Sequence, residues 1–214
     1  MSTIEIEEKP YEYYNQLITL IGQSGSGKST FLRKLTPGNT FQEQSEPSKV
    51  LDAKILELEI NNEKFQIDII DTPGKKEHEH TLNGCMIESD AIIFFYDIRS
   101  SKDIFNYLEN SIKKIKEKRK ENEVKKEPIY FLLGTFADLE KERKIQTETF
   151  KEFCQKNSIN FVDEISLKTI QEEQLKTLIK GMVSIYVRNF FKGTEEKEKK
   201  IEDKNSSCPC CIIS

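Results

Sequence analysis

Short apolar runs alternate along this chain with longer segments whose apolar residues recur at helical spacing. Continuous apolar runs are typical of strands that are buried on both faces. Runs that alternate apolar and polar residues are typical of strands with one solvated face, and Asn61-Asn62 between two of these predicts a hairpin turn. The expected strands are residues 17–21, 55–60, 65–70, 91–96, 129–133 and 161–165.

Helical spacing appears between most of these strands. Apolar residues recur at three- and four-residue intervals after a glycine-rich segment near residue 25, through 104–115, around 150–153 and through 175–186. Strands that alternate with helices predict an α/β fold. We therefore expect a mostly parallel six-stranded sheet with helices on both faces.

Length and composition narrow the picture. The chain has 214 residues, which gives room for one domain with a sizeable core. A formal charge of −4 argues against a broad basic surface that would bind nucleic acid. No apolar run reaches the ~20 residues that a membrane span needs, and the acidic first ten residues lack the apolar core that is typical of a secretory signal. Cys85 and Cys154 are expected to be free thiols, as in a reducing cytosol.

Two charged stretches indicate how the chain is organised. Residues 113–127 hold eight basic and four acidic residues, which is typical of a solvated helix end and loop, with a partner or membrane contact as the alternative. Residues 192–207 hold five lysines and five acids and are typical of a flexible linker. The expected division is an extension at 1–13, a nucleotide-binding domain at 14–191 and a tail at 192–214.

The glycine-rich segment carries the clearest chemical signal. Residues 22–29, GQSGSGKS, satisfy the P-loop pattern between a buried strand and a helix. Glycines let successive backbone N–H groups surround a phosphate, and the helix N-terminus favours the anion. Lys28 is expected to neutralise the β- and γ-phosphates, and Ser29 to bind Mg²⁺. The expected phosphate-binding residues are Gly22, Ser24, Gly25, Ser26, Gly27, Lys28, Ser29 and Thr30.

Two further segments, 71–74 and 46–48, resemble elements of the Ras superfamily of small GTPases. Residues 71–74, DTPG, resemble D-x-x-G, in which Asp71 holds Mg²⁺ and the Gly74 N–H meets the γ-phosphate. Residues 46–48, EPS, resemble the switch I motif, so Ser48 is the expected Mg²⁺ ligand, with Thr40 as the alternative hydroxyl. By the same spacing, Phe41 falls where an aromatic ring stacks on guanine.

The base-recognition elements follow the fifth and sixth strands. Residues 134–139, GTFADL, resemble G-[NT]-K-x-D-L, with Thr135 as in Rho proteins and Asp138 reading guanine. Phe136 replaces the usual lysine, which loses a polar contact while keeping a surface for stacking. Residues 166–168, SLK, resemble S-A-K, so Ser166, Leu167 and Lys168 are also expected to contact guanine.

Taken over residues 14–190, the chain resembles a divergent member of the superfamily, nearest to the Ras and Rab families. The resemblance implies a P-loop, Ras-like fold, the cofactors GTP or GDP and Mg²⁺, and a monomer. It also implies an exchange factor, a GTPase-activating protein and effectors as partners, in membrane trafficking or signalling.

Hydrolysis is the step on which this sequence departs most from the resemblance. Lys75 stands where the family's water-positioning glutamine follows the glycine of D-x-x-G. A lysine has no carbonyl with which to orient the attacking water. We therefore expect low intrinsic turnover or dependence on a partner, with Lys28, Gly74 and Lys75 at the catalytic positions. His78 and His80 have metal-ligand spacing but are more simply explained as loop residues.

The last four residues, CIIS, fit the C-a-a-X pattern, in which a terminal serine favours farnesyl transfer to Cys211. Stable anchoring takes two signals, and Cys208 or Cys210 is a site for palmitoylation. Alternatively, Cys210-Cys211 resembles the double-cysteine endings of some Rab proteins, which carry two geranylgeranyl groups. Both readings involve a prenyltransferase and place the protein on the cytoplasmic face of a membrane, with a cytosolic pool.

Two rival functions remain open at this point. The first is a pseudo-GTPase, an interaction module that binds nucleotide weakly or holds it without turnover, which Phe136 and Lys75 favour. The second is a P-loop ATPase or small-molecule kinase, which Asp138 and the lipidation-like tail disfavour.

Overall fold

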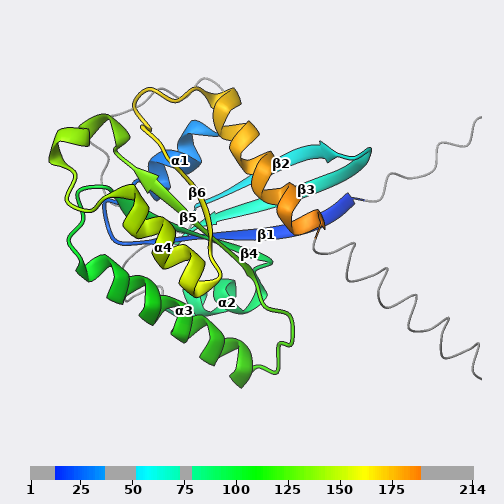
Figure 1. The fold of residues 1–214 in the computed structure, drawn as a ribbon. Coiled ribbons are helices and arrows are strands. Elements are labelled where there is room, and N and C mark those ends of the chain that lie inside the picture. The colour runs from blue at the N-terminus through cyan, green and yellow to red at the C-terminus, as the bar shows by residue number, and fades with distance from the viewer. Residues whose placement is uncertain (1–12, 37–51, 73–78, 189–214) are drawn as a thin grey trace, which may run out of the picture.

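In the computed structural model, which describes residues 13–36, 52–72 and 79–188, a central sheet separates two layers of helices (Figure 1). The sheet has six strands in the order β2-β3-β1-β4-β5-β6. All neighbouring pairs are parallel except β2 and β3, which form an antiparallel hairpin. The α/β fold with a mostly parallel six-stranded sheet is confirmed. Its strands are β1 (Tyr13–Gly22), β2 (Asp52–Ile60), β3 (Glu63–Asp71), β4 (Ala91–Asp97), β5 (Ile129–Thr135) and β6 (Asn160–Glu164).

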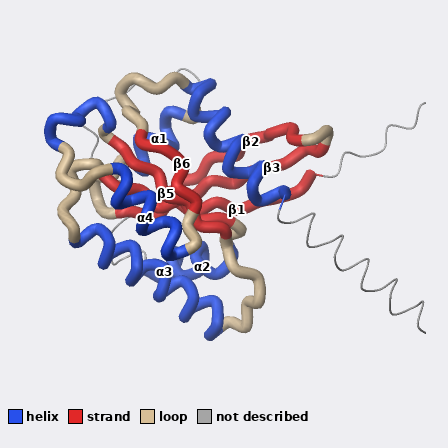
Figure 2. Tube along the Cα trace, viewed as in Figure 1, coloured by secondary structure: helices blue, strands red, loops and turns tan. Residues whose placement is uncertain are grey.

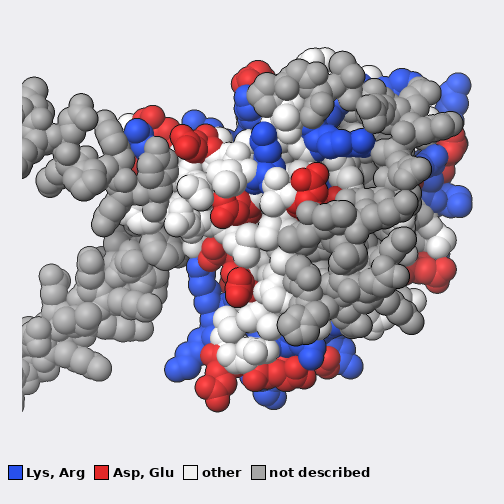
Figure 3. Space-filling model, turned by 180° about the vertical axis from the view of Figure 1, so that it is seen from behind, with Lys and Arg blue, Asp and Glu red and all other residues white. Residues whose placement is uncertain are grey.

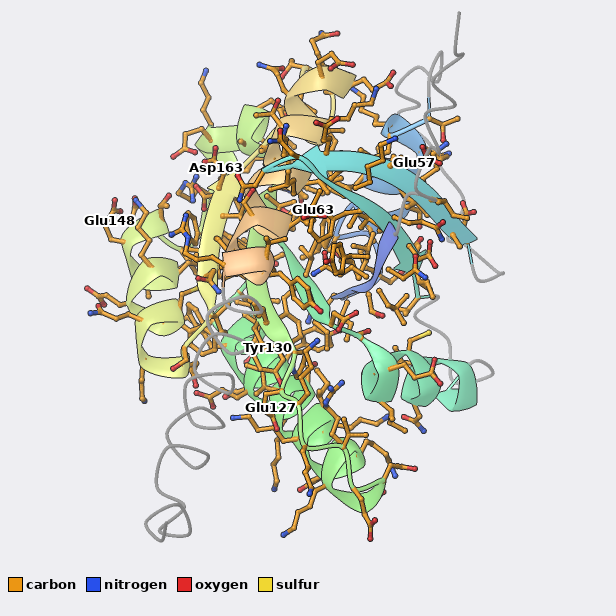
Figure 4. The ribbon with its side chains drawn as sticks, turned by 90° about the vertical axis from the view of Figure 1, so that its right-hand side faces the viewer. Glu57, Glu63, Glu127, Tyr130, Glu148 and Asp163 are labelled. Carbon is orange, nitrogen blue, oxygen red and sulfur yellow. The ribbon has the colours of Figure 1, made fainter. Side chains whose placement is uncertain are left out.

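The hairpin forms for the reason that its sequence indicates. Asn61 and Asn62 have φ values of 54° and 66°, the left-handed region that a two-residue type I′ turn requires and that asparagine tolerates. Ile60 pairs with Glu63 directly across this turn. Glu57 and Glu63 mark the two strands in Figure 4.

Helices cover both faces of the sheet (Figure 2). On one face lie α1 (Lys28–Lys34) and a C-terminal helix that the structure describes over 172–188. On the other lie α2 (Glu79–Glu88), α3 (Asp103–Glu121) and α4 (Thr147–Asn157). A separate apolar core fills each interface, one containing Phe31 and Leu175 and the other Leu108 and Phe150. Burial in these two cores stabilises the three layers.

The charged stretch at 113–127 differs from expectation at one residue. Arg119 is only 3% exposed, although most of its neighbours are solvated. Its guanidinium donates to the carbonyl oxygens of Met86 (3.0 Å), Ile87 (2.6 Å) and Ser89 (3.1 Å) at the end of α2, and to that of Lys126 (3.1 Å). Arg119 therefore ties α3 to α2 and to the loop that leads into β5. Figure 4 shows Glu127 and Tyr130 where that loop meets the strand.

Charge on the described surface is mixed rather than segregated. On the face that Figure 3 shows, basic and acidic side chains of the described residues are interspersed. Within the described ranges, no helix is long and apolar enough to cross a membrane. The same ranges contain no group of three or more His, Cys, Asp and Glu side chains that could hold a metal ion.

Candidate functional site

The parallel register brings the ends of four strands to one edge of the sheet. Leu20 of β1 pairs with Asp71 of β3, Gly22 pairs with Phe95 of β4, and Asp97 at the end of β4 pairs with Thr135 at the end of β5. In open α/β sheets this carboxyl edge is where ligands bind. The P-loop, Asp71 and the start of the G-T-F-A-D-L segment therefore lie at the same edge of the sheet.

Backbone geometry explains the glycines of the P-loop. Gly25 and Gly27 have φ values of 79° and 91°, which side chains rarely tolerate. A Cβ atom on Gly22 would lie 2.7 Å from the carbonyl oxygen of Phe95, so β1 and β4 pack too closely for one. Phe31 N–H donates to the Gly27 carbonyl at 2.8 Å and starts α1 directly after the loop. The loop therefore ends at a helix N-terminus, as a phosphate cradle requires.

Lys28 folds back over the loop that precedes it. Its side chain is buried, and Nζ donates to the carbonyl oxygens of Gly22 (2.8 Å) and Gln23 (3.1 Å). Burial lowers the pKa of Lys28, an effect that the nearby Asp71 carboxylate partly offsets. The ammonium group is thus fixed at the mouth of the cradle, where a phosphate would offset its desolvation. Nearby, Ser24 is exposed on the loop and Thr30 is half-buried in α1.

Ser29 and Asp71 form the part of the site that suits a hard cation. The Ser29 hydroxyl donates to Oδ2 of Asp71, whose other oxygen, Oδ1, is buried without a partner among the described residues. Burial raises the pKa of Asp71. The hydrogen bond from Ser29 and the charge of Lys28 lower it by less, so the pKa lies above its ordinary value. Oxygen ligands at the phosphate loop are the donor set that Mg²⁺ prefers. These two residues therefore fit a magnesium ion.

Thr135 joins the base-recognition segment to the P-loop. Its hydroxyl is fully buried and lies 3.0 Å from the carbonyl oxygens of Ser26 and of Tyr96. Leu167 packs against the same loop, because a Cβ atom on Gly27 would lie 2.8 Å from its Cδ1. The loop backbone is thus wedged between residues of both segments that resemble guanine-binding elements.

The two base-recognition segments also contact each other. The Ala137 N–H donates to the Ile165 carbonyl at 3.2 Å, and the Ile165 N–H donates to the Gly134 carbonyl at 2.9 Å. Asp138 and Lys168 are both exposed beside this junction. The Ser166 hydroxyl is buried without a hydrogen-bond partner in the structure. These two hydrogen bonds bring Asp138 and Ser166 to the same junction, because each comes directly after a bonded residue.

Glu164, at the end of β6, is hydrogen-bonded to three residues near this junction. It accepts hydrogen bonds from the hydroxyls of Tyr96 and Thr147, both at 2.6 Å, and Arg143 Nη2 donates to it at 2.7 Å. Burial raises the pKa of Glu164, but its bonds to Arg143, Thr147 and Tyr96 outweigh burial and hold that pKa below its ordinary value. A charged, fully bonded carboxylate is therefore part of the scaffold rather than of the ligand surface.

Arg99 is the site residue that sequence reasoning missed. It follows β4, and its Cζ atom lies 4.4 Å from the centroid of the Phe136 ring. Phe136 has a left-handed φ of 62° at the turn after β5. No motif of the sequence joins two residues so far apart, so only the pairing of β4 with β5 could have indicated the contact.

A cleft of about 600 Å³ opens beside the P-loop. One wall is the loop itself, at 23–26, and the other carries the turn after β4 and the segment before α4. The charged residues of that second wall are Asp97, Arg99, Glu142 and Lys144. The phosphate loop therefore borders a polar hollow rather than an apolar one.

Several sequence predictions lie outside the described residues. They concern the switch and tail segments and the N-terminal extension. The predicted site residues in this group are Phe41, Ser48, Gly74, Lys75, Cys208, Cys210 and Cys211, with Thr40 and His78 among the alternatives.

Comparison with known proteins agrees with this geometry. The model of the Ras family matches residues 17–184. The chain is 24% identical to "Ras-related protein Rab-13" of Rattus norvegicus over 208 residues, which is 95% of this chain and 98% of the relative. It is 26% identical to "GTP-binding protein YPT1" of Saccharomyces cerevisiae over 192 residues, 89% of each chain. With "Ras-related protein YPTC6" of Chlamydomonas reinhardtii it shares 25% over 171 residues, 79% of this chain and 76% of the relative.

Proposed function

The chain belongs to the Ras family, and we propose that it is a guanine-nucleotide switch that binds GTP or GDP with Mg²⁺. One observation carries the proposal: Thr135 bonds the P-loop at Ser26, while Ala137, one residue before Asp138, bonds the segment that leads to Ser166. Phosphate-binding and base-reading groups thus lie on one rigid frame. The yeast relative is a GTP-binding protein by name, which supports the same ligand.

Each group at the site has a role in this proposal. Gly25, Gly27 and the start of α1 direct N–H groups toward the phosphates, and Lys28 neutralises them. Ser29 and Asp71, with Ser48, hold Mg²⁺, which neutralises charge on the β- and γ-phosphates when bound. Asp138 accepts hydrogen bonds from guanine.

Hydrolysis is proposed to be slow without a partner. Lys75 replaces the residue that positions the attacking water in the related families, and the P-loop and Mg²⁺ alone leave that water without an orienting carbonyl. GTP to GDP conversion then depends on a GTPase-activating protein, and reset of the switch on an exchange factor. Effectors read the GTP-bound state.

A lipid tether completes the proposal. The C-a-a-X ending at Cys211, with Cys208 or Cys210 as a second acylated residue, attaches the domain to the cytoplasmic face of a membrane. The names of the relatives, which include Rab and YPT proteins, support a role in vesicle trafficking or signalling at that surface.

A second candidate function is supported by two specific residues. Phe136 and Lys75 both depart from the family pattern, and together they favour a pseudo-GTPase that holds nucleotide without turnover. An ATPase or kinase is less well supported, because Asp138 offers guanine N1 and N2 an acceptor that adenine cannot use.

Ser29→Asn tests the magnesium part of the proposal. The larger amide side chain removes the hydroxyl ligand and crowds Asp71, so GTP affinity in Mg²⁺ should fall, while affinity in EDTA changes little. Ser101→Asn, at an exposed position before α3, serves as the matched control. If the Ser29 variant binds GTP in Mg²⁺ as tightly as the unchanged protein does, the assignment of Ser29 as a magnesium ligand is contradicted.

A further inference from the structure

The Arg99 side chain is held in a fixed position at the mouth of the cleft. Nη2 lies 2.7 Å from Oδ2 of Asp97, and Nε lies 2.9 Å from Oδ1. The Arg99 N–H also donates to Oδ1 of Asp97 at 2.8 Å, which fixes the turn after β4. The side chain remains 33% exposed. Arg99 is therefore orientated by the protein itself while part of it faces the cleft.

The guanidinium has donors left over for a ligand. An arginine carries five N–H groups. Asp97 takes one from Nε and one from Nη2, and Nη1 reaches Glu142 at the longer distance of 3.5 Å. Two of the five N–H groups therefore have no acceptor within the part of the chain that the structure describes. They belong to a residue that lines the same cleft as residues 23–26 of the P-loop.

The stacking partner of Arg99 ties it to the base-recognition segment. Phe136 lies between Thr135, which contacts the P-loop at Ser26, and Asp138. Cation–π contact, with Cζ 4.4 Å from the ring centroid, holds the guanidinium against Phe136. A cationic side chain thus lines the cleft beside the phosphate loop and contacts the base-recognition segment at Phe136, although position 136 itself carries no charge.

We propose that Arg99 is an additional nucleotide-binding residue, which uses its spare N–H donors on the sugar-phosphate part of a bound guanosine diphosphate or triphosphate. Phe136 serves as its platform, so the departure at 136 is compensated by a cation that β4 supplies. The inference rests on the proposed function, because it requires that a guanine nucleotide occupies the P-loop.

The test is the dissociation constant of GDP in Mg²⁺, measured on the full-length chain and its variants. Arg99→Ala should raise that constant about tenfold, the loss of a charge-assisted hydrogen bond. Lys102→Ala, which removes an equal charge from an exposed position three residues further on, should leave it unchanged. Circular dichroism and thermal unfolding show whether each variant is folded.

Rescue distinguishes a ligand contact from a structural role. Adding Phe136→Lys to Arg99→Ala returns a cation to the base-recognition segment and should recover most of the affinity. If Arg99 only stabilised the turn after β4, a lysine at position 136 would recover none of it. If the unchanged protein binds GDP and Arg99→Ala binds it equally well, the role of Arg99 is overturned and the proposed function stands. If Arg99→Ala weakens binding and the lysine restores none of it, the charge-compensation account is wrong. No binding by the unchanged protein overturns both.

Discussion

The Thr135 hydroxyl and the Ser26 carbonyl oxygen, 3.0 Å apart, join the end of β5 to the P-loop. The two residues are distant in the sequence, and the hydrogen bond between them is fully buried on the Thr135 side. Through this contact, the strand that leads to Asp138 also sets the position of the loop that would hold the phosphates. Recognition of the base and of the phosphates is thereby linked in one frame.

Thr135→Val should loosen that link. Valine keeps the shape of threonine but leaves the Ser26 carbonyl without its donor, which costs about 1 kcal/mol of stability. We expect faster dissociation of GDP, followed with a fluorescent analogue, together with a lower midpoint of urea unfolding. Thr177→Val, in the C-terminal helix where the residue is exposed, is the matched control. Unchanged dissociation in the Thr135 variant would show that the contact does not position the loop.

Asp71 should contribute oppositely to folding and to function. Because burial raises its pKa above the ordinary 3.8, the folded protein holds this proton more tightly than the unfolded chain does. The stability of the nucleotide-free protein should therefore fall as pH rises above that ordinary value and through the raised pKa. Asp71→Asn removes this dependence, and we expect it to stabilise the nucleotide-free protein at pH 7 by about 1 kcal/mol.

The same variant should lose Mg²⁺-dependent GTP binding, since an amide is a poorer ligand for the ion. Denaturant unfolding between pH 4 and pH 8 and nucleotide titrations with and without Mg²⁺ measure the two effects. Asp163→Asn, at the exposed position labelled in Figure 4, controls for loss of a charge. A destabilised Asp71 variant that still binds GTP through Mg²⁺ would contradict both expectations.

Lys75→Gln should restore faster hydrolysis. A glutamine carbonyl can orient the attacking water, so we expect the single-turnover rate with GTP to rise by about tenfold or more. Lys76→Gln makes the same chemical change one residue further on and should have little effect. Equal rates in both variants would mean that the missing glutamine does not limit turnover.

The tail variants distinguish the two lipidation schemes. If C-a-a-X directs farnesylation, Cys211→Ser should abolish membrane recovery, and Cys210→Ser should keep the prenyl group on the protein. If the paired cysteines each carry a geranylgeranyl group, either substitution should reduce prenylation. Mass spectrometry of the protein from eukaryotic cells identifies the lipid, and an unmodified tail would overturn the tether.

The two cysteines within the folded domain, Cys85 and Cys154, should be unreactive toward thiol reagents. Burial raises the pKa of the Cys154 thiol to about 12, and burial also raises that of Cys85. Reactivity follows the thiolate, so both thiols should resist iodoacetamide at pH 8 in the folded protein. Labelling of Cys85 or Cys154 before unfolding would contradict this placement in the two helices.

Local signals were sufficient for most of the fold. The apolar runs of β4 and β5 and the Asn61-Asn62 turn predict the elements that the structure shows. Helix α2 was not predicted, because its apolar residues follow no clear helical period. The turn at Ala137–Glu142 was missed as well, since 3₁₀ geometry has little signature in sequence.

The site was predictable where its residues stand together in a motif. Residues 22–29 and Asp71 converge because each stands at the carboxyl end of one of two parallel, paired strands. Arg99 and Arg119 were not predicted, since their partners come from other elements and the sequence shows each as one charged residue among several. Long-range pairing of that kind depends on tertiary packing, which a local pattern does not contain.

Equilibrium binding shows whether the P-loop and the base-recognition segments together select a guanine nucleotide. Fluorescent GDP and GTP are titrated into the full-length chain in Mg²⁺, with unlabelled ATP and GTP as competitors. We expect the fluorescent nucleotides to bind in the presence of Mg²⁺. Unlabelled GTP should displace them, and a large excess of ATP should not. Equal displacement by ATP, or no binding at all, would contradict this expectation and favour the ATP-using or the pseudo-GTPase alternative respectively.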